Sequence, residues 1–201
     1  MSKPLDTLWY AHSPVPTGLG IAVESGRLAD ALRPYGTTLQ ALRESTDREI
    51  REAHFDHHLQ NSVRHGGNTP AIWARASGSQ TRLLGLSWSD EIQLIVSNPD
   101  GPVKTISDLK NRRFGLPKWA NVKIDFNRAT ALRGLENALS LEGMQVSQVE
   151  LVDYPYGGTH SDNPVRHIFG AQVRLSGKQV RRSNRELVGL MNGTVDAIFL
   201  K

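Results

Sequence analysis

Four histidines between residues 54 and 65 are the first side chains whose type and spacing could do chemistry. His54, His57, His58 and His65 could share a metal ion, because imidazoles four residues apart on a helix face the same side. The stretch from His54 to His58 is predicted to be a polar loop, however, and no carboxylate-rich motif accompanies it. We therefore interpret the histidines as solvated, and we predict no metal and no other cofactor.

The cationic side chains favour chemistry with oxyanions. Lysine and arginine number 24 against 20 acidic residues, a formal net charge of +4. The planar guanidinium group of arginine suits the oxygens of carboxylates, phosphates, sulfonates and sulfinates. The loop from His12 to Pro16 lies between a predicted strand and a predicted helix, and a helix N-terminus offers unpaired N–H groups to an anion. This loop is a candidate binding site, or its Ser13 serves only to cap the helix.

A basic run near the end of the chain suggests a second kind of anionic partner. Its members, with no acid between them, are Arg166, Arg174, Lys178, Arg181, Arg182 and Arg185. Such a run can track nucleic-acid phosphates. Phe169 is its only aromatic residue, though, and no helix-turn-helix or zinc motif is present. We interpret the run as a solvated face and predict no nucleic-acid partner.

The elements that must position these residues alternate between strands and helices. Strands are predicted at residues 5–10, 38–42, 81–88, 92–97, 146–152 and 195–200, with a short one after the polar corner at 110–113. Helices are predicted at residues 17–32, 46–53, 68–75, 125–141 and 186–191, and loops at 54–67 and 154–163. This order predicts an α/β fold with largely parallel sheets.

Composition excludes several classes of protein. The chain has 201 residues, 38% hydrophobic and 22% charged, which fits one or two small lobes. It has no cysteine, so disulfides, thiolate nucleophiles and cysteine-based zinc sites are excluded. The chain contains no apolar run of about 18 residues, so the sequence predicts no helix that spans a membrane. The N-terminus lacks the apolar region of a signal peptide, so we expect a cytoplasmic protein as written, or a periplasmic one if the true N-terminus is missing.

Two motifs in the second half resemble a known family. The stretch from Asp108 to Pro117 is similar to the DLKGKRVGVP signature of ABC-transporter solute-binding proteins of the nitrate, sulfonate and taurine type. The stretch from Leu190 to Ala197 is similar to their L..GEVDA element. This resemblance implies a bilobal fold like that of type-II periplasmic binding proteins, with a first lobe at 1–90 and a second at 91–201. It also implies that the chain is truncated at its C-terminal side, before the segment that returns to the first lobe.

Motifs in the first lobe resemble the aryl-sulfinate desulfinases of dibenzothiophene desulfurisation, which share this fold. They are Ser13-Pro14-Val15-Pro16, Glu24-Ser25-Gly26, His54-Phe55 and Arg64-His65-Gly66-Gly67. The resemblance implies an oxyanion pocket of Ser13, His54, Arg64, Gly66 and Gly67. Its catalytic set would be Ser13, His54 and Arg64, with Ser13 in the place of the family's cysteine. A serine hydroxyl is a far weaker acid and nucleophile than a thiol.

The loop from Pro117 to Asn121 would face the cleft in such a fold. Its Trp119 would pack on an apolar ligand tail, or the loop is an ordinary connection from strand to helix. The predicted ligand-binding residues are thus those of the first-lobe pocket together with Trp119.

These observations favour a binding protein of the ABC-transporter type that holds a small organic oxyanion, sulfonate or sulfinate, between its lobes. A transporter permease is the further partner that the resemblance implies. The alternative is an enzyme like the desulfinases that cleaves a carbon–sulfur bond, with His54 activating Ser13 or water. A third interpretation, a regulatory effector-binding module like that of LysR-type regulators, would need a DNA-binding segment that does not precede Leu5.

Overall fold

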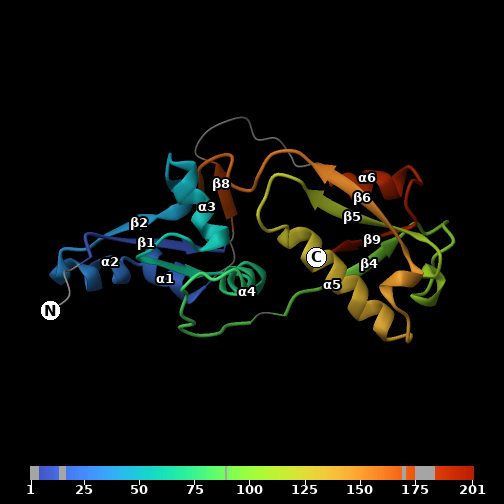
Figure 1. Ribbon diagram of the computed structural model, residues 1–201, viewed down its shortest axis with the longest axis horizontal. Helices are drawn as coiled ribbons and strands as arrows, with labels where there is room; N and C mark the ends of the chain where they lie inside the picture. Colours follow the sequence, from blue (N-terminus) through green and yellow to red (C-terminus); the bar gives the residue numbers. More distant parts are fainter. Residues whose placement is uncertain (1–4, 14–16, 89, 169–170, 175–183) are drawn as a thin grey trace. The chain divides into compact units, whose positions relative to one another are not determined.

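The chain folds into two compact units, each with its own sheet (Figure 1). The computed structural model describes residues 5–13, 17–88, 90–168, 171–174 and 184–201. The first unit comprises Met1–Arg82 and Thr159–Gln179, and the second comprises Leu83–Gly158 and Val180–Lys201. The segment Thr159–Gln179, which we expected in the second lobe, therefore belongs to the first unit. The reason is long-range hydrogen bonding, because buried arginines of the first unit hold the backbone of residues 160–162.

The first unit is built on a parallel three-stranded sheet in the order β2-β1-β3. The strands are β1 (Thr7–His12), β2 (Thr38–Ala41) and β3 (Ser62–His65), and the helices are α1 (Gly18–Glu24), α2 (Arg27–Leu32), α3 (Arg48–Asp56) and α4 (Asn68–Ala76). Short 3-10 turns lie at Arg33–Tyr35 (η1) and Leu42–Glu44 (η2), and β7 (Val165–Ile168) pairs antiparallel with β8 (Ala171–Arg174). Ala11, Leu42 and Ala53 form a small buried core.

The second unit contains a four-stranded sheet in the order β4-β9-β5-β6. Its strands are β4 (Leu94–Ser97), β5 (Arg113–Trp119), β6 (Glu150–Tyr156) and β9 (Ala197–Leu200). Its helical elements are η3 (Ser107–Leu109), α5 (Phe126–Ser140), η4 (Val146–Gln148) and α6 (Arg185–Met191). β5 runs parallel to both β6 and β9, whereas β4 runs antiparallel to β9. Helix α5 packs its buried Leu135 and Leu139 against Phe114 and Leu116 of β5 in the main core.

The α/β class and the parallel sheets confirm the prediction from sequence, but four local expectations were wrong. Within the loop predicted at 54–67, residues 54–56 are the last turn of α3 and Ser62–His65 is strand β3. Residues 81–88 form no regular element at the positions that the structure describes. The strand expected at 146–152 begins only at Glu150, after η4, and it continues through Tyr156 into the predicted loop. The helix expected at 17–32 is interrupted at Gly26, whose φ of 75° ends one helix and starts another. None of the described helices is long and apolar enough to cross a membrane.

Candidate functional site

The carboxyl ends of β1 and β3 bring two of the predicted site segments together. The parallel register places His12 opposite His65, and the backbone N–H of Ser13 donates to the His65 carbonyl at 2.9 Å. The chain leaves this sheet edge through Ser13 on one strand and through Gly66 and Gly67 on the other. Side chains and N–H groups at the carboxyl edge of a parallel sheet are where ligands of α/β proteins bind. Ser13, Arg64, Gly66 and Gly67 therefore share one edge.

Helix α1 begins beside this edge and is capped by a residue other than Ser13. The Thr17 hydroxyl accepts a hydrogen bond from the Gly20 N–H at 3.0 Å. A Cβ on Gly20 would lie 3.4 Å from His12 Nδ1, so the first turn of the helix packs closely on β1. Thr17 thus has the capping role that the sequence allowed for Ser13, and this role does not occupy the Ser13 hydroxyl. Residues 14–16, between them, lie outside the described part of the chain.

The guanidinium of Arg64 folds back over the glycines that follow it. Its Nη1 donates to the Gly67 carbonyl at 3.0 Å, and a Cβ on Gly66 would lie 2.7 Å from Nη2. Its Nε is buried and has no hydrogen-bond partner within the described chain. Burial lowers the pKa of Arg64 to about 10, so the group remains a cation at neutral pH. A charged guanidinium with unused donors is a group that can hold an oxyanion.

His54 lies in the last turn of α3 and is buried, with 7% of its surface exposed. Its ring meets that of Phe55 edge-on, with centroids 4.7 Å apart. The helix thus places His54 in a packed environment, not in the solvated loop that the sequence suggested. Its action as a base on Ser13 stays a prediction.

His57 also lies in this region and was not among the residues predicted for the anion site. It ends α3 in the left-handed conformation, with φ of 56°, and its Nε2 is buried without a hydrogen-bond partner among the described residues. Burial and the nearby charge of Arg64 lower the pKa of His57 to about 4, against a smaller opposite effect of Asp56. His57 is therefore neutral at pH 7, and the charge of Arg64 reaches it. No signal in the sequence distinguishes it from its histidine neighbours.

The metal hypothesis for the histidine group finds no support in the geometry. His58 Nδ1 lies 2.5 Å from an oxygen of Asp56 in a local pair. Across the part of the chain that the structure describes, no three histidine, aspartate or glutamate side chains gather closely enough to hold a metal ion.

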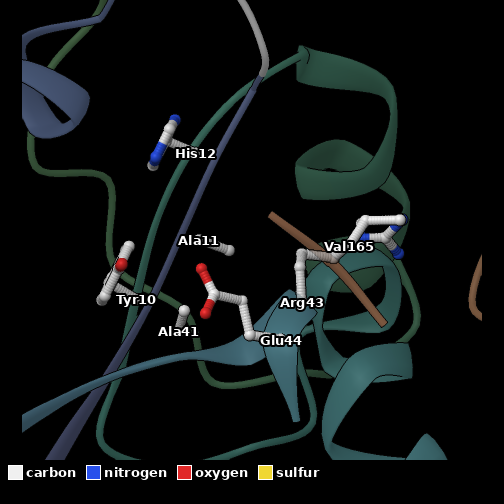
Figure 2. Close-up of a pocket in the computed structure, with 7 residues that line it drawn as sticks. All are labelled: Tyr10, Ala11, His12, Ala41, Arg43, Glu44 and Val165. Carbon is white, nitrogen blue, oxygen red and sulfur yellow. The ribbon is translucent and has the colours of Figure 1, made fainter. Parts of the chain in front are cut away.

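A shallow hollow that opens to solvent lies beside the same edge of the first unit (Figure 2). It is lined by Tyr10, Ala11, His12, Ala41, Arg43, Glu44 and Val165. Figure 2 shows Tyr10 and His12 on one side of β1 and Ala11 on the other. The rings of Tyr10 and His12 stack with their centroids 6.1 Å apart. Arg43 is buried, lies 5.0 Å over the Phe55 ring and donates to the His160 carbonyl at 3.0 Å. Arg43 and Glu44 were not among the predicted site residues, because no local motif marks them.

Trp119 belongs to the second unit, where it ends β5. Its ring stacks on Tyr156 at the end of β6, with centroids 4.9 Å apart and planes 7° apart. The Tyr156 hydroxyl donates to Glu186 at 2.6 Å, and burial together with this bond raises the pKa of Tyr156 to about 12. The Arg185 guanidinium lies 5.3 Å over the same ring. Trp119 is thus part of a fixed aromatic and cationic group, and its contact with a ligand tail stays a prediction.

Most of the basic run from Arg166 to Arg185 lies outside the residues whose side chains the structure describes. The solvated face that we predicted there is therefore not tested. Arg185, at its end, is the described exception.

Comparison with known proteins places this fold in a class. No family model matches the chain. The chain has 16% identity and a TM-score of 0.56 to the periplasmic aliphatic sulphonate-binding protein SsuA from Escherichia coli, over 96% of this chain and 50% of that one. A cysteine-to-serine variant of DszB, solved with biphenyl-2-sulfinic acid, matches with a TM-score of 0.64 and 24% identity, over 97% of this chain and 59% of that one. The chain therefore has the α/β fold of the periplasmic binding proteins, as the resemblance implied.

Sequence similarity identifies a more specific relationship within this class. The chain is homologous to the 2'-hydroxybiphenyl-2-sulfinate desulfinases of Rhodococcus erythropolis and Rhodococcus qingshengii, with 34% identity over 96% of its length. The alignment covers 56% of those relatives, so the chain spans about half of their length. The first-lobe resemblance predicted from the sequence is confirmed by this homology.

Proposed function

We propose that the chain provides the anion-binding half of a desulfinase-like protein, and that it holds an organic sulfinate at the carboxyl ends of β1 and β3. One observation carries the proposal. The Arg64 guanidinium is kept charged and folded over Gly66, with a buried Nε that no described group satisfies. A buried donor of this kind costs free energy unless a partner arrives, and a sulfinate oxygen supplies one.

Other groups at the edge complete the coordination that a sulfinate needs. The Ser13 hydroxyl can donate to one oxygen, since helix α1 is capped by Thr17 instead. Helix α4 starts at Asn68 after Gly67, which has no side chain to cap the first turn. The N–H groups at the start of α4 receive no side-chain cap, and their partial positive charge would add to the charge of Arg64. The sum favours a compact monoanion with two oxygens.

The homologues support two separate parts of the proposal, turnover of such a ligand and its binding. The relatives that share 34% identity are named as desulfinases. The related DszB was solved with biphenyl-2-sulfinic acid in a serine variant, which supports a serine-bearing pocket as competent to bind a sulfinate. In the reaction, water is consumed, the carbon–sulfur bond breaks, the ring carbon takes a proton and the sulfur leaves as hydrogen sulfite. His54 would supply the base that activates Ser13 or the water.

Calorimetric titration with biphenyl-2-sulfinate, an alkanesulfonate, sulfate and nitrate tests the proposed ligand class. We expect the sulfinate to bind best and Arg64→Gln to weaken it at least tenfold, about 1.4 kcal/mol. Arg75→Gln is the matched control, because Arg75 is an exposed arginine on α4 whose Nη1 contacts only the Ser79 carbonyl within the described chain. Equal affinities for all four anions, or equal losses in both variants, would contradict the proposal.

A sulfite assay on the same samples separates the two functions. Sulfite release in proportion to time supports the desulfinase function. Saturable sulfinate binding without any sulfite supports the alternative, a binding protein of the ABC-transporter type.

A further inference from the structure

Two nitrogens in the first unit are buried without a hydrogen bond, although both belong to strongly hydrogen-bonding groups. One is Nε of Arg64 on β3, and the other is Nε2 of His57, the residue that ends α3. Neither nitrogen has a hydrogen-bond partner within the part of the chain that the structure describes. Buried polar atoms of native proteins are nearly always satisfied, so each of these two is a candidate for a ligand contact.

The backbone determines where the His57 ring stands. His57 has φ of 56°, and its backbone N–H donates to the Ala53 carbonyl at 3.1 Å. A residue other than glycine is seldom found in this left-handed region, and such residues cluster at functional sites. The fold therefore holds His57 at the end of α3 without any hydrogen bond from Nε2 to a described residue.

The carboxylate that precedes His57 in the chain is engaged by a different histidine. Asp56 is buried, and its Oδ1 accepts from the backbone N–H of His58 at 3.2 Å. The same oxygen lies 2.5 Å from His58 Nδ1. Among the described residues, no anion therefore bonds directly to Nε2 of His57 and stabilises a proton on its ring.

Burial and, second, the charge of Arg64 lower the pKa of His57 to about 4, while Asp56 acts in the opposite direction. The elements around α3 carry further ionisable groups: Arg43 and Glu44 on η2, His65 on β3, Arg75 on α4, and His160, whose ring packs on Phe55. Of the cations, Arg64 is the one that lowers the pKa of His57. The effect of burial persists when a ligand binds, but a negative charge beside Arg64 cancels the effect of its cation.

We infer that His57 takes up a proton when a sulfinate binds beside Arg64, and that its Nε2 then donates to the bound anion as a second cationic group. The proton comes from solvent and bonds to the ring nitrogen that has none, and it returns to solvent when the anion leaves. By linkage, an anion that raises the proton affinity of His57 must itself bind more tightly as the pH falls. This inference rests on the proposed sulfinate function, and it adds a preference for anions that stay ionised in mild acid.

Calorimetric titration with biphenyl-2-sulfinate tests the coupling in pairs of buffers that have the same pH and different heats of ionisation. The difference in heat between the two buffers gives the number of protons taken up. We expect about half a proton per bound sulfinate at pH 5 and less than about a tenth at pH 7.5. The affinity should be at least twofold higher at pH 5. In His57→Asn both the uptake and this pH dependence should disappear, because asparagine tolerates the left-handed backbone and does not titrate.

His58→Asn is the matched control, because His58 is the neighbouring histidine and pairs with Asp56. Its proton uptake on sulfinate binding should stay close to that of the wild type. A purely structural role of His57 would instead lower the affinity of His57→Asn equally at both pH values and leave the proton count unchanged.

Nuclear magnetic resonance of the wild type provides a measurement that needs no variant. The pKa of His57, followed through its ring Cε1 proton, should rise from about 4 in the free protein to 5 or above with saturating sulfinate. Absence of sulfinate binding at both pH values would overturn the proposed function and this inference with it. Binding without proton uptake, with the same His57 titration in the free and bound protein, would overturn this inference alone. Uptake that persists in His57→Asn and is lost in His58→Asn would assign the proton to His58 and overturn it as well.

Discussion

The Arg64 guanidinium occupies the space that a side chain on Gly66 would need, since a Cβ there would lie 2.7 Å from Nη2 and 2.8 Å from Cζ. The Gly66→Ala substitution must therefore displace the guanidinium from its position over the loop. Arg64 is long and flexible at this end, so the fold should tolerate the shift, with a stability change within about 0.5 kcal/mol. We expect sulfinate affinity to fall about tenfold, because the cation no longer points at the ligand position. Titration calorimetry measures this loss.

Gly67→Ala is the control for that experiment. A Cβ on Gly67 would have no atom within 4 Å, and its φ of −55° is open to alanine. We expect near-normal affinity for this variant. If both variants bound equally well, the position of the Arg64 guanidinium would not matter for the anion.

His57 should make the first unit less stable in mild acid. Its pKa is about 4 in the folded chain and 6.5 as the ordinary value, so between these pH values the unfolded chain binds the extra proton. The contribution of His57 to the free energy of unfolding is therefore fully present above about pH 6.5 and is lost as the pH drops towards 4. We expect a loss of about 1.5 kcal/mol, below the full value of the shift because the half-buried ring is partly screened by water.

Urea unfolding at pH 7 and pH 4.5, in the wild type and in His57→Asn, measures this effect. Asparagine tolerates the left-handed backbone at this position and does not titrate. The pH dependence should shrink in the variant, while the slope that comes from other groups remains. An identical pH dependence in both proteins would show that the pKa of His57 is not lowered in the folded chain.

Arg51 is expected to hold residues 161 and 162 on the first unit. It is buried, and it donates to the carbonyls of Ser45, Thr46, Ser161 and Asp162 at 2.8 to 3.3 Å. Arg51→Met would leave these buried carbonyls without a donor, so we expect a loss of about 3 kcal/mol. Hydrogen exchange should then accelerate at residues 160–163 before it does so in β1.

Arg48→Met on the same helix is the matched control. Arg48 is largely exposed, and its Nε lies 3.8 Å from Glu52, so its removal should cost less than about 0.5 kcal/mol. Comparable losses in both variants would contradict the role given to Arg51.

Elements with local signals could be predicted from the sequence. The helix expected at 125–141 is observed at Phe126–Ser140, because Asp125 caps it by accepting from the Arg128 N–H at 3.0 Å. Long-range contacts could not be predicted in this way. Arg51 and Ser161 are 110 positions apart, and nothing near either residue indicates their hydrogen bond. The strand predicted at 81–88 fails for the same reason, since a strand depends on a partner elsewhere in the chain.

The candidate site, too, could be predicted only in part from the sequence. Residue type and resemblance selected Ser13, Arg64, Gly66 and Gly67, and parallel pairing of β1 with β3 gathers them at one edge. His54 was selected too, but its burial follows from an α3 that extends through Phe55, whose ring packs against His160. The roles of His57 and Arg43 could not be predicted. That of His57 arises from the left-handed backbone at the end of α3, and that of Arg43 arises from its hydrogen bond to the distant His160 carbonyl.

Ser13→Cys is expected to increase sulfite release from an aryl sulfinate by at least tenfold. A thiol ionises far more readily than a hydroxyl, and its thiolate is the stronger nucleophile towards sulfur. Ser13 is held at the sheet edge by its own N–H bond to His65, which does not depend on its side chain, so the substitution should leave the position unchanged. Sulfite is measured against time at pH 7 to 9, where a growing thiolate fraction should raise the rate of the variant but not of the wild type. Ser25→Cys, at the end of α1, controls for a thiol in general. Equal rates in all three proteins would show that Ser13 does not stand at the reacting sulfur.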